Sequence, residues 1–526
     1  MGNTRIEWRC VMTQPIVIRG ARIMLSDADP HQPPRRDVYV TDGRIARIVP
    51  PGEPVPLPPD AIVIEAADKM IVPGFVNAHY HSYDVLAKGL MEDLPFDLWA
   101  LLSQPGYWGR RSHAELRLRT LIGGLECLKN GVTCVQDMNT IVPQDEDALD
   151  VILAAYEELG IRVVMSLAVR DVAELDIAPF MADDIPASIN SIVKGAPGDA
   201  DAELAFVAAQ ISRIGTSRPR LHWAISPSGP QRCSTHLLEG LAGIAHDYDL
   251  PVFTHVYETR AQLAKARSAY PEHGGSLIRR LADTGLLGAK TTLAHSVWIT
   301  KEEIEALAAA GTSVAHNPMA NLKLKSGIAP LLDLHAAGVN VALGCDNCSC
   351  GDTQNMFQAM KLFTLLAGAM DGLPTGVGAA EALHSATLGG ARAVGLENEI
   401  GAIAIGMQAD FSIIDLSDIA YQPFNSALRQ MVYAECGRGV SSVVVDGRLV
   451  IRDGKATGID EATLYAELAD LMIAYRAEFR QLEQRHSPAF PYLIDANRRL
   501  AQENLGMDRF IQRAASRPDP LLKGMK

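Results

Sequence analysis

Short apolar segments alternate with amphipathic segments through the middle of this chain. The apolar segments are typical of buried parallel strands, whereas the amphipathic ones have helical spacing and several of them end in glycine. The eight apolar runs lie at residues 70–79, 132–137, 162–169, 220–226, 251–255, 291–295, 312–317 and 339–346. This alternation predicts an α/β fold, either a (β/α)8 TIM barrel or a flat doubly wound sheet. The count of eight favours the closed barrel.

The two ends of the chain carry strands of another texture, rich in Val and Ile. These strands lie within residues 15–25, 37–49, 61–66, 409–416 and 441–455. Asp42-Gly43 and Asp446-Gly447 are dipeptides that favour hairpin turns. Because both ends share this pattern, we expect them to pair into one small composite β-sandwich domain that the barrel interrupts.

These patterns divide the chain into five predicted segments. They are a flexible N-terminal extension at residues 1–12, the first part of the β-sandwich at 13–72, the barrel at 73–404, the second part of the sandwich at 405–456, and a C-terminal helix and arm at 457–526. In the last segment, apolar residues at spacings of three and four predict a long helix with Asp460 as its N-cap. Its apolar face contains Leu464, Leu468, Leu471, Tyr475, Phe479 and Leu482. The final forty residues mix Pro, Arg and Asp, and we expect an irregular arm that packs on a neighbouring subunit in a homodimer or larger homo-oligomer.

Composition narrows the range of partners. The net charge of −14 argues against nucleic acid, because a phosphate backbone recruits basic surfaces. No apolar run approaches the roughly 20 residues that span a bilayer, and the N-terminus lacks the pattern of a secretory signal. The eight scattered cysteines suit a reducing cytoplasm. We therefore expect a cytoplasmic protein with a small-molecule substrate and neither a nucleic-acid nor a membrane partner.

Side chains with metal-binding and acid–base chemistry occur where the predicted barrel strands end. His79 and His81 end the first strand and, two residues apart, share one face of it. Later strands end at His255, His295, His316 and Asp346. A single histidine at such a position is more often an ordinary polar residue. Six residues at matching strand ends instead favour one shared site, because the carboxyl ends of barrel strands form the active site.

Three imidazoles and a carboxylate are ligands suited to zinc or iron(II). We expect one divalent metal per subunit, which lowers the pKa of bound water from about 15.7 to about 7. Glu258 lies three residues after His255 and could carry a proton to a leaving group, although a surface ion pair explains its position equally well. Cys345 and Cys348 form a C-x-x-C pair without a second pair to complete a zinc site, so we expect these thiols to pack or to line a pocket.

Residues 73–81, 254–259, 293–300, 316–330 and 343–347 resemble the ordered motifs of the amidohydrolase superfamily. The resemblance is closest to its cytosine deaminase-like and chlorohydrolase/aminohydrolase branch, and it extends from Pro15 to about Lys455. It implies a distorted barrel with a composite β-sandwich. The fourth strand has no terminal lysine, so the two-metal form with a carbamylated lysine is not expected.

The resemblance also implies roles for individual residues. By position, the metal ligands are His79, His81, His255 and Asp346, the last of which also takes a proton from water. His295 resembles the histidine that hydrogen-bonds the hydroxide or the substrate, and Glu258 resembles the proton shuttle of the deaminating members. The chain departs from the usual motifs at Tyr80 and at Ser228, where many deaminases of this branch carry a histidine.

The implied function is an aminohydrolase, a deaminase in which metal-bound hydroxide displaces ammonia or an amine from an N-heterocycle such as a purine, pterin or triazine. One alternative is hydrolysis of a C–Cl, thioether or amide C–N bond by the same site. Another is a metal-free, non-enzymatic scaffold, which the complete ligand set disfavours. The residues expected to bind substrate are Tyr80, Trp99, Trp108, Ser228, Gln231, His316 and Asn317.

Overall fold

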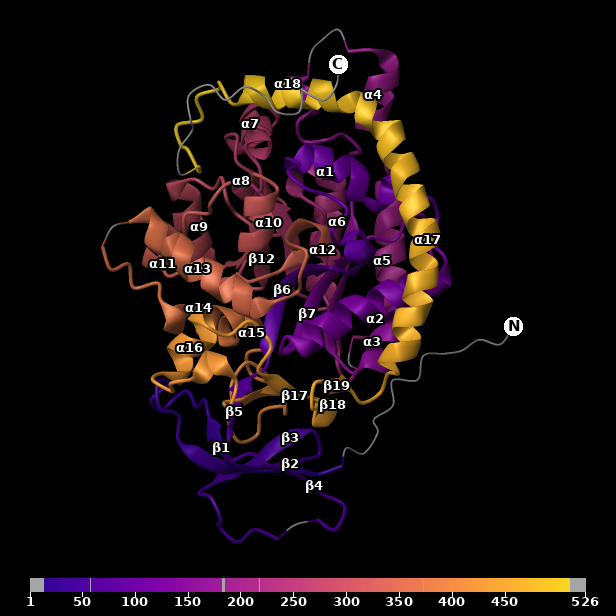
Figure 1. The fold of residues 1–526 in the computed structure, drawn as a ribbon. Coiled ribbons are helices and arrows are strands. Elements are labelled where there is room, and N and C mark those ends of the chain that lie inside the picture. The colour runs from indigo at the N-terminus through magenta and orange to yellow at the C-terminus, as the bar shows by residue number, and fades with distance from the viewer. Residues whose placement is uncertain (1–13, 57, 182–184, 217, 372, 511–526) are drawn as a thin grey trace.

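The structure is a computed structural model that describes residues 14–56, 58–181, 185–216, 218–371 and 373–510. A barrel of strands and helices forms the body of the molecule, and a sheet domain closes one end of it (Figure 1). The predicted extension at residues 1–12 lies outside the described residues, as does the end of the predicted C-terminal arm.

The sheet domain joins the two ends of the chain, as the sequence predicts. Its nine strands are β1 (Ile16–Ile23), β2 (Arg35–Thr41), β3 (Arg44–Val49), β4 (Ile62–Glu65), β5 (Lys69–Pro73), β16 (Phe411–Asp415), β17 (Val440–Val445), β18 (Arg448–Arg452) and β19 (Lys455–Ala456). The junction is an antiparallel ladder between β5 and β16. Both predicted hairpin turns form, with positive φ at Asp42, Gly43, Asp446 and Gly447, as two-residue turns of this kind require.

The barrel strands follow the predicted runs. They are β6 (Phe75–His81), β7 (Val132–Asn139), β8 (Arg162–Val169), β9 (Leu221–Trp223), β10 (Ser226–Pro227), β11 (Val252–Val256), β12 (Thr291–His295), β13 (Ser313–His316), β14 (Val341–Leu343) and β15 (Asp346–Asn347). They form two parallel sheets, β10-β8-β7-β6-β15 and β11-β12-β13-β14, with β9 beside β8. A bridge between Ile225 and Val252 connects the sheets on one side. On the other side β15 continues from β14 and pairs with β6, which completes the circular order of the predicted barrel.

Capping residues and glycines in the sequence explain where several helices begin and end. Their bounds are α1 (Phe96–Ser103), α2 (His113–Lys129), α3 (Glu146–Leu159), α4 (Ala187–Lys194), α5 (Ala200–Ile214), α6 (Thr235–Asp247), α7 (Arg260–Ala269), α8 (Leu277–Asp283), α9 (Lys301–Ala310), α10 (Pro318–Lys323), α11 (Leu331–Ala336), α12 (Cys348–Gly351), α13 (Met356–Met370), α14 (Ala379–Ala386), α15 (Leu388–Ala393), α16 (Ala427–Tyr433), α17 (Glu461–His486) and α18 (Phe490–Leu500). Thr300 forms a capping box at the start of α9, and Asp145 caps α3. Gly160 and Gly311 end α3 and α9 in the left-handed conformation that glycine accepts without a steric cost.

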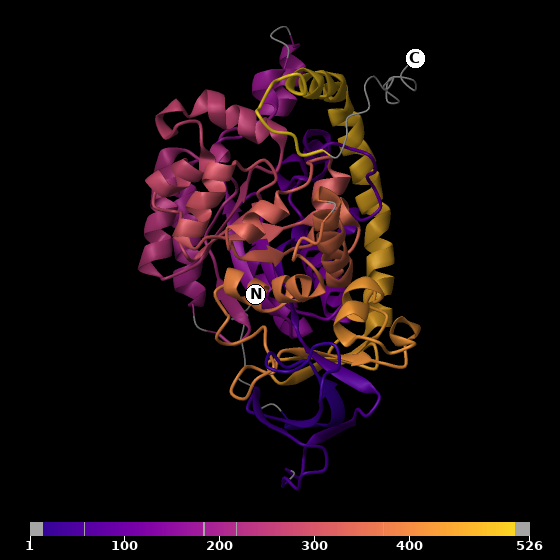
Figure 2. The same ribbon diagram turned by 90° about the vertical axis from the view of Figure 1, so that its left-hand side faces the viewer.

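The C-terminal segment crosses the molecule from one end to the other. As predicted, Asp460 caps α17, which buries Leu464, Tyr475, Phe479 and Leu482 and runs along the side of the barrel (Figures 1 and 2). The expectation of an irregular arm is wrong for residues 490–500, which form α18. Pro491 is compatible with a helix here because it stands in the first turn, where its missing N–H leaves no intrahelical hydrogen bond unmade.

Helix α18 lies across the end of the barrel opposite the sheet domain (Figure 1). It buries Leu493, Ala496 and Leu500. Among the described residues, no helix combines the length and apolar character needed to cross a membrane.

Candidate metal centre and active site

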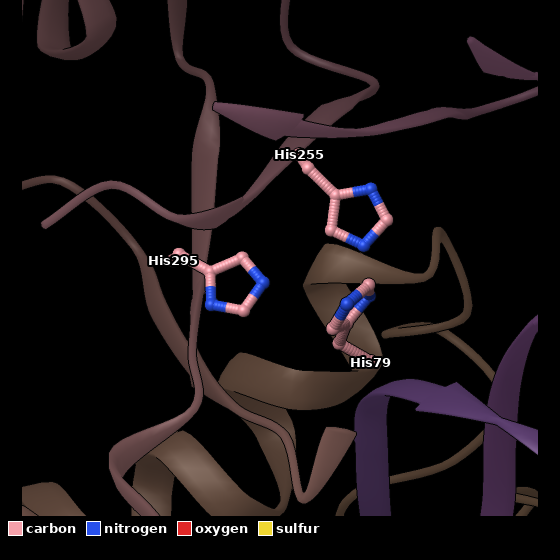
Figure 3. A group of neighbouring side chains, drawn as sticks. All are labelled: His79, His255 and His295. Carbon is pink, nitrogen blue, oxygen red and sulfur yellow. The ribbon is translucent and has the colours of Figure 1, made fainter. Parts of the chain in front are cut away.

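The polar side chains predicted at the strand ends meet in one buried cluster. The Nε2 atoms of His81 and His255 lie 3.2 Å apart, although the two residues are 174 positions apart in the sequence. Asp346 Oδ1 lies 3.6 Å from His79 Nε2 and 3.5 Å from His81 Nε2. Figure 3 shows His79, His255 and His295 converging from three strands on one point. The structure therefore brings together all four predicted metal ligands.

Main-chain carbonyl groups fix which nitrogen of two histidines faces the cluster. His81 Nδ1 donates to Met138 O at 2.6 Å, and His255 Nδ1 donates to Ser228 O at 2.6 Å. With hydrogen on Nδ1, each Nε2 carries a lone pair that can bind a cation, and the two Nε2 atoms lie 3.2 Å apart. Two nitrogens bound tetrahedrally to one zinc at about 2.0–2.1 Å lie about 3.3 Å apart. The cluster thus fits a divalent cation.

Unpartnered buried atoms support the same conclusion. Both ring nitrogens of His79 and the Nε2 atom of His295 are buried. Among the described residues, none of these three atoms has a hydrogen-bond partner. Burial and the neighbouring His81 lower the pKa of His79 well below the usual range, and burial lowers the pKa of His81 to about 4. These imidazoles are therefore neutral at physiological pH, which is the state that binds a metal.

A second group of residues beside the ligands has acid–base chemistry. Glu258, His295 and Asp346 offer atoms that lie within 4.8 Å of one another. His295 Nε2 is 3.7 Å from Glu258 Oε2 and 3.7 Å from Asp346 Oδ2, while its Nδ1 donates to Asn321 Oδ1 at 2.8 Å. His295 therefore presents a lone pair to both carboxyl groups.

Burial controls the protonation of this group. Burial, and then the charge of Asp346, raise the pKa of Glu258 well above its usual range. Burial raises the pKa of Asp346 to about 7, and burial lowers the pKa of His295 to about 3. Burial thus favours the protonated form of Glu258, which can donate a proton, beside a neutral His295. A bound cation would instead favour the ionised form of Asp346.

Several residues beside the cluster have unusual backbone conformations. Tyr257, His295 and Asp346 have φ values of 52°, 69° and 61°, in the left-handed region that side chains other than glycine rarely adopt. Such strain persists only where the surrounding structure imposes it, and it concentrates at functional sites. The turns occur where the strands end at the cluster.

A cavity of about 380 Å³ opens onto the cluster. Of the residues expected to bind substrate, Trp99 and Ser228 line it. The remaining five, Tyr80, Trp108, Gln231, His316 and Asn317, are not among its lining residues, and their contact with substrate stays a prediction.

Each of these five is placed elsewhere by the packing of the fold. Tyr80 alternates with the two histidines along β6, so it points to the opposite face, where a side chain at Gly123 would collide with its hydroxyl. Trp108 stacks on Tyr475 of α17 with a centroid distance of 4.9 Å. Gln231 contacts the buried carboxyl group of Asp176.

The last two lie close to the catalytic group without reaching the cavity. The ring of His316 is fully buried and lies 6.1 Å from that of Phe363. Asn317 Nδ2 lies 3.4 Å from His295 Nδ1, so this residue supports His295.

Several lining residues were missed by the sequence analysis. They are Tyr83, Phe96, Gln104, Thr140, Arg232 and Asn347. Arg232 donates to Asp176 Oδ2 at 2.7 Å and lies 5.6 Å from the centre of the Phe96 ring. Although burial opposes it, Arg232 holds the pKa of Asp176 below the usual range. These residues lie in α1, in β15, in short 3-10 helices and in loops, and no spacing in the sequence connects them.

Comparisons with known proteins agree with this geometry. Residues 70–450 match the family model described as Amidohydrolase family. The chain is 32% identical to a 5'-deoxyadenosine deaminase from Methanothermobacter thermautotrophicus over 84% of this chain and 94% of that protein. It is 31% identical to a 5-methylthioadenosine/S-adenosylhomocysteine deaminase from Moorella thermoacetica over 78% of this chain and 88% of that protein.

Solved structures show the same fold. A zinc-bound adenosine deaminase from Xanthomonas campestris superposes with a TM-score of 0.75 at 28% identity, covering 89% of this chain and 98% of that one. The atrazine chlorohydrolase TrzN from Arthrobacter aurescens TC1, also complexed with zinc, gives a TM-score of 0.75 at 22% identity over 87% of this chain and 100% of that one. At this lower identity the second likeness shows the fold alone.

Proposed function

The chain belongs to the amidohydrolase family, and we propose that it is a metal-dependent deaminase that releases ammonia from an amino-substituted N-heterocycle. As a member of this family it is a hydrolase that acts on carbon–nitrogen bonds. The observation that carries the proposal is the position of the Glu258 carboxyl group, which is buried at the cavity 3.7 Å from His295 Nε2 and in the same group of side chains as Asp346. An amine leaves poorly unless it is protonated, so a deaminase needs such a donor at the site of reaction.

We assign the cation site to His79, His81, His255 and Asp346. Three imidazoles and one carboxylate suit zinc, with iron(II) as the alternative. When bound, the cation activates water at neutral pH. The zinc-bound adenosine deaminase neighbour supports this choice of metal.

The chain's own residues then divide the proton transfers. Asp346 accepts the proton of the attacking water, and its Oδ2 lies 3.7 Å from His295 Nε2, which accepts a hydrogen bond from the same water or from substrate. Glu258 protonates the ring nitrogen, takes up the hydroxyl proton of the adduct as its carbonyl group forms, and passes that proton to the leaving amine. The proton held by Asp346 then returns to Glu258, which restores the starting state. Gln262 holds the main chain at Glu258 in place, because its Oε1 accepts a hydrogen bond from the Glu258 backbone N–H at 2.8 Å.

Adenine nucleosides are the first substrates to test, because the relatives named above act on such compounds according to their names. Purified, zinc-loaded protein should release ammonia from 5'-deoxyadenosine or S-adenosylhomocysteine, with the change in ultraviolet absorbance that accompanies loss of the amino group. Release from neither, nor from pterins or other aminopurines, would contradict the proposal.

Chloride release from a chlorotriazine would instead support the alternative hydrolase. Two further properties remain proposals: a location in the cytoplasm, supported by free cysteines such as Cys345 and Cys348, and a homo-oligomeric state.

A further inference from the structure

Arg232 lines the catalytic cavity, and none of the proton transfers proposed above involves it. It ends the short 3-10 helix Pro230–Arg232, which begins two residues after Ser228. Ser228 lines the cavity too and stands where many deaminases of the resembling branch carry a histidine. Its carbonyl group is already bonded to His255, and its side chain is short. Arg232 is therefore the long polar side chain that this segment contributes to the cavity wall.

The guanidinium group of Arg232 is held in one position. Its Nη2 donates to Asp176 Oδ2 at 2.7 Å, and Asp176 is itself 1% exposed. The same carboxylate oxygen accepts from Gln262 Nε2 at 2.9 Å, and Gln231 Nε2 lies 3.3 Å away. The guanidinium carbon lies 5.6 Å from the centre of the Phe96 ring, which lines the same cavity. A side chain fixed in this way loses little conformational entropy when it binds a ligand.

Most of the donors of this guanidinium group are left for a ligand. A guanidinium group has five N–H donors, and Asp176 accepts only from Nη2. Among the described residues, the Arg232 side chain forms no other hydrogen bond, and none of its nitrogens is both buried and unpartnered. The remaining N–H groups therefore keep accessible surface, and the space that this residue lines is the catalytic cavity.

The charge of Arg232 acts on the reaction centre itself. Burial, and then the neighbouring His81 and His295, lower the pKa of His255, and the charge of Arg232 lowers it further. Burial and the charge of Asp346 raise the pKa of Glu258, and the charge of Arg232 opposes them. The guanidinium group is thus close enough to the metal site and to the proposed proton donor to contact the same substrate.

We propose that Arg232 donates a hydrogen bond to an oxygen acceptor on the substrate, either a ring keto oxygen or a carboxylate, and so selects amino-substituted heterocycles that carry one. The inference rests on the proposed deaminase function, whose substrate class it narrows. A guanidinium group stays charged and cannot accept a hydrogen bond, so only an acceptor can pair with it. Solvent can satisfy its N–H groups while the cavity is open. A substrate that fills the cavity without an acceptor leaves a charged donor unpaired, which is unfavourable.

Three matched pairs of compounds test the proposal: isoguanine with adenine, guanine with 2-aminopurine, and S-adenosylhomocysteine with 5'-methylthioadenosine. Within each pair the leaving amine is the same. The first member adds a ring keto oxygen in the two purine pairs and an amino acid carboxylate in the third. Each compound is assayed for ammonia release with the zinc-loaded wild type and with Arg232→Met. Intrinsic reactivity then cancels, because each compound is compared between the same two enzymes.

In at least one pair, Arg232→Met should lower kcat/KM for the oxygen-bearing member by roughly tenfold or more beyond its effect on the partner compound, the effect of one hydrogen bond to a charged group. A purine pair identifies a keto oxygen as the ligand, and the third pair identifies a carboxylate. Equal losses for both members of all three pairs would overturn the inference. Wild-type turnover of only the members that lack the oxygen would overturn it as well.

A second variant covers the case in which Arg232→Met does not fold. The double change Arg232→Met with Asp176→Asn removes both charges of the pair, so no buried charge is left unpaired. It should show the same selective loss. The matched control is Arg162→Met with Asp410→Asn, because this ion pair is also buried but neither residue lines the cavity. The control should leave the ratio of kcat/KM within every pair unchanged, and the same selective loss in the control would overturn the assignment to Arg232.

Calorimetric binding separates this inference from the proposed function. If the zinc-loaded wild type releases ammonia from none of the six compounds, the deaminase proposal is contradicted for these substrates. Their binding can still be compared between the wild type and the Arg232 variants. Weaker binding of an oxygen-bearing compound, with binding of its partner unchanged, supports the role of Arg232. Equal changes for both members of every pair overturn it.

Discussion

Glu258→Gln is the change that most directly tests the proposed chemistry. The amide keeps the shape and hydrogen-bonding capacity of the side chain but cannot give up and regain a proton. Glu258 is 2% exposed, so bulk water has little access to replace it. Neither neighbouring group can replace Glu258 as the proton donor. Asp346 must take the proton of water, and His295 has a pKa of about 3 and is neutral.

The size of the expected loss of turnover follows from the lack of another proton donor at this position. General acid catalysis is worth roughly 10²–10⁴-fold in rate, which is about 3–5 kcal/mol of transition-state stabilisation. Because no other group near the leaving amine is free to donate, we expect kcat to fall by roughly two to four decades. Metal content should stay close to that of the wild type, since Glu258 is not among the four proposed ligands.

The assay is steady-state ammonia release with the best substrate from the nucleoside screen, together with elemental analysis of each variant. Glu115→Gln is a suitable control, because Glu115 is also buried but pairs with Arg111 at the start of α2, away from the cavity. It should turn over substrate much as the wild type does. Asp346→Asn should be at least as damaging as Glu258→Gln. Ammonia release above about a third of the wild-type rate in Glu258→Gln would refute the assignment of the proton shuttle.

Four further predictions concern metal, stability and assembly. The protein should contain about one zinc or iron per chain, and His255→Ala should lose most of it; full occupancy in that variant, by elemental analysis, would contradict the ligand assignment. Burial and the charge of Asp176 raise the pKa of Asp97 to about 7 in the folded protein, so the folded state binds this proton more tightly than the unfolded chain does. Stability from this group is present below the unfolded pKa near 4 and is lost as the pH rises through about 7. Asp97→Asn should therefore raise the melting temperature more at pH 8 than at pH 5, and equal shifts would contradict the argument. Asp410→Ala should lower the free energy of unfolding by roughly 3–5 kcal/mol in denaturant titrations. The change leaves the buried guanidinium group of Arg162 without the carboxylate to which it donates two hydrogen bonds. Light scattering at micromolar concentration should report a homodimer or larger assembly, and a clean monomer would exclude it.

The fold was predictable where local patterns carry the information. Eight apolar runs predicted the barrel strands. The Asp-Gly pairs at Asp42 and Asp446 predicted hairpins, because few residues accept the positive φ of such turns. The apolar face of α17 was also predictable from a local pattern, since helical spacing places Tyr475 and Phe479 on one side of the helix. The prediction failed at α18, where packing against α1 and α7 stabilises a helix that composition alone did not indicate.

The sequence by itself determined the chemistry of the centre. The spacing of His79 and His81, and the polar residues His255, His295 and Asp346 at later strand ends, sufficed because a strand alternates its faces and barrel strands end on one side. Only the tertiary structure decided how those groups are held and what surrounds them. The carbonyl groups that orient His81 and His255 belong to the main chain, which every residue has, so they leave no mark in the sequence. The wall of the catalytic cavity comes from strand ends, from α1 and from loops that lie far apart in the chain, and their proximity depends on long-range packing that no local pattern encodes.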